Sequence, residues 1–231
     1  MFMSTLIKIC GLAAPEAVDA AMKAGADLLG FVFFDKSPRH VSLEQAGRLG
    51  ARAGSGAARV LLTVDADDAL LAAAIAALDP QFLQLHGGET PERVAAIRAC
   101  FGVKVIKAIG IGDSADLAEI GRYDDVADML LFDARPKAAT DRPGGNGGAF
   151  DWSLLRGLKT KKPWLLAGGL NAGNVAQALI ETGAPGVDVS SGVESAPGVK
   201  DKDKIADFVA RARAAEIAAL WEKRRGTVAA R

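Results

Sequence analysis

The sequence has 231 residues, of which 50% are hydrophobic and 24% are charged, with 28 basic residues against 28 acidic ones. This length fits one large domain, and the hydrophobic fraction is ample for a buried core, which excludes disorder as the main state. A formal net charge of zero gives no electrostatic footprint for nucleic acid or for an anionic membrane, so we expect small molecules or other proteins as partners.

The cysteines and the N-terminal residues indicate the compartment. No apolar run reaches the roughly 18 residues that span a bilayer, and MFMSTLIKIC lacks the basic segment, apolar stretch and cleavage site of a signal peptide. We expect Cys10 and Cys100 each to be buried in or beside an apolar run, which suits a reducing compartment better than a disulfide framework. We therefore expect a cytoplasmic protein, and two histidines without clustered cysteines argue against a zinc site.

Short runs rich in Val, Ile, Leu and Phe alternate with Ala-rich segments along the whole chain. The runs are too uniformly apolar for a sheet with one wet face, which predicts strands that are buried on both sides. In chain order, the predicted strands are residues 6–10, 28–33, 60–64, 82–85, 103–109, 129–133, 164–167 and 186–190.

The segments between these runs carry apolar residues at spacings of three and four, and many start with Ser, Thr, Asp or Asn and end with Gly. The predicted helices are residues 15–26, 42–53, 65–78, 90–101, 114–123 and 171–184. Strand–helix units that recur about every 30 residues predict a single-domain (β/α)8 TIM barrel. A doubly wound open sheet is the alternative, but no G-x-G-x-x-G follows the first strand.

Two segments fall outside this rhythm. Residues 134–149, after the sixth strand, are rich in Gly, Pro and charge, and we predict a long active-site loop there. Residues 214–231 extend beyond the last expected helix. We expect Ile217, Leu220 and Trp221 to continue an amphipathic helix against the barrel, and the basic cluster after them to be a solvated end rather than a nucleic-acid patch.

Polar residues gather where the predicted strands end. Ligands of parallel barrels bind at the carboxyl ends of the strands, so these residues form the predicted site. They include Lys8, Cys10, Arg39, Asp65, His86, Asp113, Asp133 and residues 190–194.

The ends of the seventh and eighth strands predict a phosphate site. Paired glycines let backbone amides approach an anion, and a helix that starts at Asn171 or Asn174 adds its N-terminal dipole. Each piece alone is more often an ordinary turn, but together they occupy the corner that such barrels use for phosphate. The candidate phosphate-binding residues are Gly168, Gly169, Ser190, Ser191 and Gly192.

Cys10 and Asp133 end the first and sixth strands, which lie three steps apart in a closed ring of eight. A thiol and a carboxyl group on opposite sides of a substrate fit a base and an acid. The alternatives are a small buried hydrophobic residue for Cys10 and a turn cap for Asp133. As a base, Cys10 needs a pKa below its usual value of about 8.5, or a small thiolate fraction must suffice.

Arg39 follows Ser37-Pro38 on what we expect to be an exposed turn, where its guanidinium could bind a planar carboxylate through two hydrogen bonds. A solvated loop arginine is an equal alternative. His86 is either a substrate-binding residue, a base or, more often for such a residue, a structural imidazole. Asp188 is placed to order substrate hydroxyls or the serine loop. Neither a calcium loop nor a nucleotide P-loop motif is present, so we expect no metal and no nucleotide cofactor.

Several collinear motifs resemble the phosphoribosylanthranilate isomerase family of tryptophan biosynthesis. They are KICGL, GFVF followed by SPR, LQLHG, LLFDA, GGNGGAFDW, AGGLNAGNV, VDVSSGVES and PGVKD. The resemblance spans Lys8 to about Phe208. It implies a (β/α)8 barrel that rearranges a phosphosugar–anthranilate substrate, N-(5'-phosphoribosyl)anthranilate, to the 1-deoxyribulose phosphate without a metal or organic cofactor.

The resemblance also implies roles for single residues. Cys10 matches the general base, Asp133 the general acid and Arg39 the residue that binds the anthranilate carboxylate. Asp188 matches a substrate-contacting aspartate, and the glycines and serines named above match the phosphate loops. The chain departs from the family at Gly148 and Ala149, where the family often has Lys and Thr.

Two other functions compete with this interpretation. A related bisubstrate isomerase also processes a histidine precursor, but such enzymes have an aspartate where Cys10 stands. A non-catalytic phosphosugar sensor would need neither Cys10 nor Asp133. Because the sequence shows no long, flat apolar surface, we expect a monomer.

Overall fold

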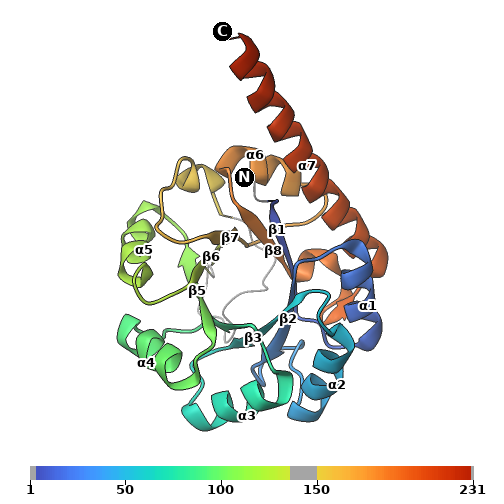
Figure 1. The fold of residues 1–231 in the computed structure, drawn as a ribbon, viewed down its shortest axis with the longest axis vertical. Helices are drawn as coiled ribbons and strands as arrows, with labels where there is room; N and C mark the ends of the chain where they lie inside the picture. Colours follow the sequence, from blue (N-terminus) through green and yellow to red (C-terminus); the bar gives the residue numbers. More distant parts are fainter. Residues whose placement is uncertain (1–3, 136–149, 230–231) are drawn as a thin grey trace.

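The strands form one closed parallel barrel in the computed structural model, which describes residues 4–135 and 150–229. Each strand pairs in parallel with the next, and β8 pairs with β1 to close the ring (Figure 1). The strands are β1 Leu6–Cys10, β2 Leu28–Phe33, β3 Ala58–Thr63, β4 Phe82–Leu85, β5 Lys104–Ile111, β6 Met129–Ala134, β7 Trp164–Leu166 and β8 Gly186–Val189. The predicted barrel is confirmed.

Helices surround the barrel and begin where the sequence supplies caps. Ser42 forms a capping box with Gln45 at the start of α2, and the Thr90 side chain accepts a hydrogen bond from Arg93 N at the start of α4. The helices are α1 Pro15–Ala24, α2 Leu43–Ala53, α3 Asp68–Leu78, α4 Pro91–Phe101, α5 Leu117–Tyr123, α6 Val175–Thr182 and α7 Lys202–Ala229. None of the helices in the described ranges is long and apolar enough to cross a membrane.

Successive residues of each strand face opposite sides of the barrel wall, so both sides are buried. Ile7, Ile9 and Phe132 belong to the large cluster between the wall and the helices, whereas Ile106 and Leu131 belong to a separate cluster inside the barrel. The alternation therefore places Lys8, Cys10 and the other even-numbered residues of β1 on the inner side. It explains why these strands are uniformly apolar in sequence.

One expectation was wrong in this part of the molecule, because Cys100, on α4, is exposed rather than buried. Two elements were not predicted. Between β6 and β7 the described residues form a short 3-10 helix, Trp152–Leu155, and after β8 a two-stranded hairpin forms from β9 (Glu194–Ala196) and β10 (Val199–Lys200), which the sequence did not predict. Pro197 and Gly198 make its turn, since Gly198 has a φ of 84°.

The C-terminal helix α7 packs on α1 and α6 in its first part and continues past the barrel (Figure 1). Up to residue 217, the last α7 residue whose side chain the structure describes, the buried residues include Phe208 and Ala215, and Ile217 is 58% exposed. The expectation that Ile217 packs against the barrel is therefore wrong, because the helix has passed the barrel wall at that point. The side chains of Leu220 and Trp221 and most of the predicted loop 134–149, including Gly148 and Ala149, lie outside the described residues.

Candidate active site

Cys10 and Asp133 both lie at the carboxyl ends of their strands and on the inner side of the wall, because their neighbours Ile9 and Phe132 face the helices. Cys10 is 4% exposed and Asp133 is 8% exposed. Cys10 contacts the apolar side chains of Val32 and Leu62. The predicted thiol and carboxyl group therefore share the mouth of the barrel.

A buried ion pair lies directly below Cys10. Lys8, one inward position earlier on β1, is fully buried, and its Nζ lies 2.8 Å from Asp188 Oδ1 on β8. Position 30 on β2 is glycine, and a Cβ there would lie 2.9 Å from Cys10 Sγ and 3.1 Å from Lys8 Nζ. The missing side chain of Gly30 therefore makes room for both the thiol and the ammonium group.

The Cys10 thiol is held mainly in its protonated form. Burial raises its pKa, and the neighbouring Lys8 cation opposes that rise without cancelling it. The pKa of Lys8 also lies above its ordinary value, because burial lowers it less than Asp188 and Cys10 raise it. Of the two alternatives that the sequence left open for a basic role, the raised pKa contradicts a lowered pKa and leaves a small thiolate fraction next to a charged lysine.

His86 contacts the predicted acid, a relationship that the sequence interpretation missed. Its Nε2 lies 3.3 Å from Asp133 Oδ2, and its Nδ1 lies 2.9 Å from Gln84 Nε2. With Gln84 in this orientation, its amide nitrogen donates to Nδ1, so a neutral ring carries its proton on Nε2, the nitrogen that faces Asp133. The signal was the spacing of Gln84, in β4, and His86, just after it, which puts both on the inner side of the barrel.

Arg39 is buried, so the expectation of an exposed turn is wrong. Its Nε and Nη2 donate to Glu194 Oε1 and Oε2 at 2.7 and 2.8 Å, and only 7% of the residue is exposed. Lys200 Nζ lies 2.6 Å from Glu194 Oε1 and donates to Ser190 O at 2.9 Å. The hairpin after β8 therefore supplies two site residues: Glu194, which belongs to the predicted strand-end residues 190–194, and Lys200, which the sequence interpretation missed. The signal for Lys200 was a charged residue on each side of a Pro-Gly turn.

Neighbouring charges and burial shift the pKa values of Glu194 and Lys200 in opposite directions. Burial would raise the pKa of Glu194, but Arg39 and Lys200 together hold it below its ordinary value. Burial lowers the pKa of Lys200, and Glu194 only partly restores it. Two cations around one carboxylate leave a net positive charge on this side of the mouth.

The predicted phosphate site consists of turns that are rich in glycine. Gly168 has a φ of 82°, and a Cβ at this position would lie 2.6 Å from Ala134 N and 3.1 Å from Asp133 Oδ1. The loop after β7 therefore lies against the acid at the end of β6. Asn174 occupies the N-cap of α6, as predicted, but its side chain makes no cap hydrogen bond to the helix and instead accepts from Asn171 N at 2.8 Å.

Among the remaining phosphate candidates, Ser190 lies near Arg39. A Cβ at Gly11 would lie 2.5 Å from Arg39 Cδ and 3.2 Å from Ser190 Oγ, so Gly11 separates these two side chains. Ser191 and Gly192 lie in the short 3-10 helix that follows β8. Within the described residues, no group of three or more His, Cys, Asp or Glu side chains is placed to bind a metal ion.

A closed (β/α)8 barrel that gathers a thiol, a carboxyl group, an imidazole and buried cations at or near the carboxyl ends of its strands has the build of a barrel enzyme. The sequence model of the N-(5'-phosphoribosyl)anthranilate isomerase family matches residues 7–211. The chain belongs to this family.

Individual relatives support the same family assignment. The chain is 65% identical over 211 residues to the N-(5'-phosphoribosyl)anthranilate isomerase of Beijerinckia indica, covering 91% of this chain and 95% of that one. It is 55% identical to the enzyme of the same name from Rhodopseudomonas palustris, covering 92% of this chain and all of the relative. The family resemblance predicted from the sequence is therefore confirmed.

Solved structures show the same fold. The phosphoribosyl anthranilate isomerase of Thermotoga maritima superposes with a TM-score of 0.81 at 32% identity, over 91% of this chain and 99% of that one. A structure of the isomerase in complex with reduced 1-(o-carboxyphenylamino)-1-deoxyribulose 5-phosphate superposes with a TM-score of 0.79 at 31% identity, over the same shares of the two chains.

Proposed function

We propose that this chain isomerises N-(5'-phosphoribosyl)anthranilate to 1-(2-carboxyphenylamino)-1-deoxyribulose 5-phosphate, a step of tryptophan biosynthesis, with Asp133 as general acid and Cys10 as general base. Family membership supports the reaction. The observation that carries the residue roles is the placement of both side chains, buried and facing inward, at the mouth of one barrel.

The proposed route starts at the furanose ring. Asp133 protonates the ring oxygen, the bond from that oxygen to C1 breaks, and the nitrogen lone pair forms an iminium ion. Cys10 then removes the proton from C2, the electrons of that C–H bond form the C1=C2 double bond, and the π electrons of the iminium bond move to nitrogen to give an enolamine, which tautomerises to the ketone. The positively charged iminium accepts the electron pair, so this route uses side chains alone.

Lys8 assists the base in this proposal. Proton removal from C2 needs the thiolate, which burial disfavours and the adjacent ammonium group favours. Asp188 balances the charge of Lys8 at 2.8 Å and remains a candidate for contact with the substrate, as the family resemblance implies.

Arg39 is proposed to bind the anthranilate carboxylate with the edge that Glu194 leaves free. A guanidinium group has five N–H donors. The Nε and Nη2 atoms each donate to Glu194, which leaves donors on the edge formed by Nη1 and Nη2. That edge has the fork geometry that matches a carboxylate.

For the phosphate, we propose the turns after β7 and β8, with the positive charge of Lys200 nearby. The backbone amides of close-approaching glycines and two serine hydroxyls supply the donors. This site comprises Gly168, Gly169, Ser190, Ser191 and Gly192.

A fluorescence assay with freshly made N-(5'-phosphoribosyl)anthranilate tests the function. We expect the substrate signal to decay at a rate proportional to enzyme concentration. Binding in calorimetry without product would instead favour a phosphosugar sensor. Turnover of the histidine-pathway aldosamine would favour the bisubstrate isomerase, and we expect none because Cys10 stands at the position of that enzyme's aspartate.

We further propose a cytoplasmic monomer that takes this small-molecule substrate and binds neither nucleic acid nor membrane. The large hydrophobic side chains exposed among the described residues are scattered over several elements rather than joined in one patch. They are Leu43, Leu70, Ile180, Val199 and Ile217. Sedimentation equilibrium measures the oligomeric state directly.

A further inference from the structure

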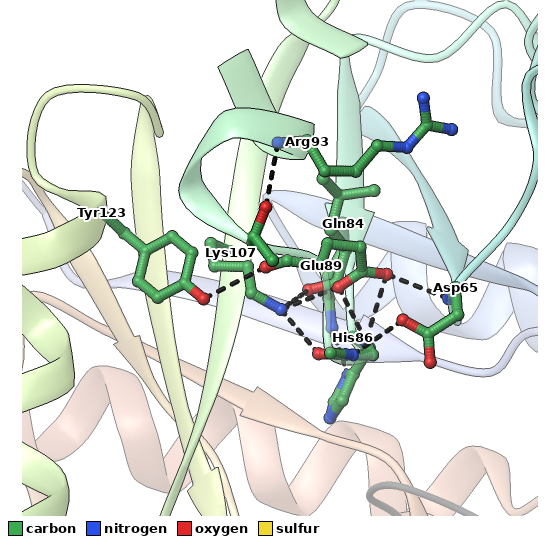
Figure 2. Close-up of polar contacts among 11 residues, drawn as sticks. Asp65, Gln84, His86, Glu89, Arg93, Lys107 and Tyr123 are labelled. Atoms are coloured by element: carbon green, nitrogen blue, oxygen red, sulfur yellow. Dashed lines mark hydrogen bonds and ion pairs between the residues drawn. The ribbon is translucent and has the colours of Figure 1, made fainter. Parts of the chain in front are cut away.

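A buried polar cluster lies outside the barrel wall, on the helix side of β4 and β5 (Figure 2). Lys107 is 2% exposed and faces outward, since Val105 and Ile109 on the same side of β5 belong to the outer hydrophobic cluster. Glu89, in the loop between β4 and α4, is 5% exposed, and its Oε2 lies 2.8 Å from Lys107 Nζ. This ion pair is therefore separated from the substrate by the barrel wall.

Besides each other, both charged groups bind backbone atoms, mostly of the segment from Leu85 to Glu89. Lys107 Nζ donates to Gly87 O at 2.8 Å and to Leu85 O at 3.4 Å as well as to Glu89. The Glu89 carboxylate accepts from Gly87 N at 3.0 Å and from Asp65 N at 3.0 Å. A buried ion pair is a poor source of stability because desolvation offsets the attraction, so its hydrogen bonds to this loop are the more informative feature.

Further contacts fix the same loop from both sides. In Figure 2, Tyr123 and Asp65 approach the Glu89 segment from opposite directions. The Tyr123 hydroxyl donates to Glu89 O at 3.0 Å, and Asp65 Oδ1 accepts from Gly88 N at 2.8 Å. Asp65 has a φ of 48°, an uncommon conformation for a residue with a side chain, which these contacts stabilise.

The residue between the two carbonyl groups that Lys107 binds is His86. The carbonyl oxygens of Leu85 and Gly87 both accept from Lys107, so the backbone on each side of His86 is fixed from outside the wall. The imidazole itself points inward, with Nε2 at 3.3 Å from Asp133 Oδ2. A continuous chain of contacts therefore connects the outer ion pair to the acid at the barrel mouth.

We propose that Glu89 and Lys107 are positioning residues for the isomerisation, and that they act by holding the loop that orients His86 toward Asp133. This inference rests on the proposed role of Asp133 as the acid. Neither residue touches the substrate. Their loss is expected to change the orientation of the His86 ring and to lower kcat more than it raises KM.

The test uses Glu89→Gln, which keeps the shape of the side chain, and Lys107→Met. We expect kcat to fall roughly 10- to 100-fold in each, the size of effect that a misplacement of about 1 Å produces, with KM changed much less. The matched control is Arg213→Met, which removes a 2.8 Å ion pair to Asp27 from the helix side of the molecule, and we expect it to retain the kcat of the wild type. A Glu89→Gln enzyme that folds and keeps full kcat overturns the proposal.

A second readout does not depend on turnover. The chain has only two histidines, so the ring nitrogens of His86 can be assigned in 15N NMR spectra by comparison with a His40→Gln variant. The wild type should show a proton on Nε2 and none on Nδ1, and Glu89→Gln should lose that preference. If the ring of the variant matches the wild type, the proposal is wrong whatever the kinetics show.

Two further measurements separate the possible failures. If both charge variants fail to fold, Tyr123→Phe replaces them, because it removes only one hydrogen bond to the loop. We expect kcat and the His86 ring signals of this variant to shift together. Unchanged values refute the proposal. If Asp133→Asn proves as active as the wild type, the proposed acid is wrong, while the NMR result still reports whether the ion pair orients His86.

Discussion

Arg39 and Glu194 form two parallel hydrogen bonds, of 2.7 and 2.8 Å, although 155 positions separate them in the sequence. Bidentate pairs of this kind fix the plane of the guanidinium as well as its place. Arg39 is thus oriented by a residue of the hairpin that follows β8.

This pairing predicts that Glu194→Gln weakens substrate binding. The neutral amide can accept from only one of the two Arg39 donors, so the guanidinium loses its fixed plane. We expect KM to rise about tenfold with a smaller change in kcat, the pattern of lost ground-state binding. Steady-state kinetics measure both constants.

The control is Glu119→Gln, which removes a 2.6 Å pair to Arg122 on the surface of α5. Exposed pairs of this type contribute little, so its kinetics should match the wild type. An unchanged KM in Glu194→Gln would show that Arg39 needs no orientation from Glu194.

Cys10→Ala and Asp133→Asn should each lower turnover by orders of magnitude. Both substitutions are small and leave the barrel wall intact, so the melting temperature should stay near that of the wild type. The fluorescence assay and thermal unfolding measure the two quantities on the same preparation. If Asp133→Asn keeps most of the activity, Asp133 is not the acid.

The pH dependence should report the buried thiol. Burial raises the pKa of Cys10, so the thiolate fraction of this residue should increase only in the alkaline range, which the ultraviolet absorbance of the thiolate in a Cys100→Ser background measures. Lys8→Met removes the cation that lowers this pKa, so the rising limb should move to higher pH.

The double variant Lys8→Met/Asp188→Asn provides the control for that shift. Asp188 raises the pKa of Cys10, so removing both charges should displace the profile less than removing Lys8 alone. A profile that moves to lower pH in Lys8→Met contradicts the thiolate base.

Gly168→Ala should destabilise the protein and reduce activity. Its φ of 82° costs a residue with a Cβ roughly 1–3 kcal/mol, and the new methyl group would lie 2.6 Å from Ala134 N, next to Asp133. Gly157→Ala is the matched control, because Gly157 has a φ of 70° but no atom within 4 Å of its Cβ position. Both variants carry the backbone strain, which denaturant unfolding measures. Only Gly168→Ala adds the clash next to Asp133, which should appear as a lower kcat. Equal losses of activity in the two variants would show that the close approach has no catalytic effect.

The barrel was predictable because its strands are buried on both sides and read as unbroken apolar runs between well-capped helices. The same alternation put Cys10 and Asp133 at inward strand ends, where a barrel carries its chemistry. Ile217 was misplaced because an amphipathic pattern does not indicate where a helix passes the edge of the structure that it packs on.

The contacts that orient the site residues could not be predicted from the apolar pattern. Arg39 looks like an exposed turn residue until the hairpin that carries Glu194 and Lys200 is known, because that contact joins distant parts of the chain. Lys107 left a clearer signal, since a lysine within an apolar strand requires a buried partner. The sequence does not show that this partner is Glu89.

The separation of Arg39 from Glu194 also governs when the site forms during synthesis. At about 5–20 residues per second, the 155 positions between them take roughly 8–31 s to translate. Arg39 therefore leaves the ribosome long before its carboxylate partner is made. A nascent chain halted before β8 carries the predicted base but has neither a closed ring nor an oriented arginine, so catalytic competence arrives with the last strand and its hairpin.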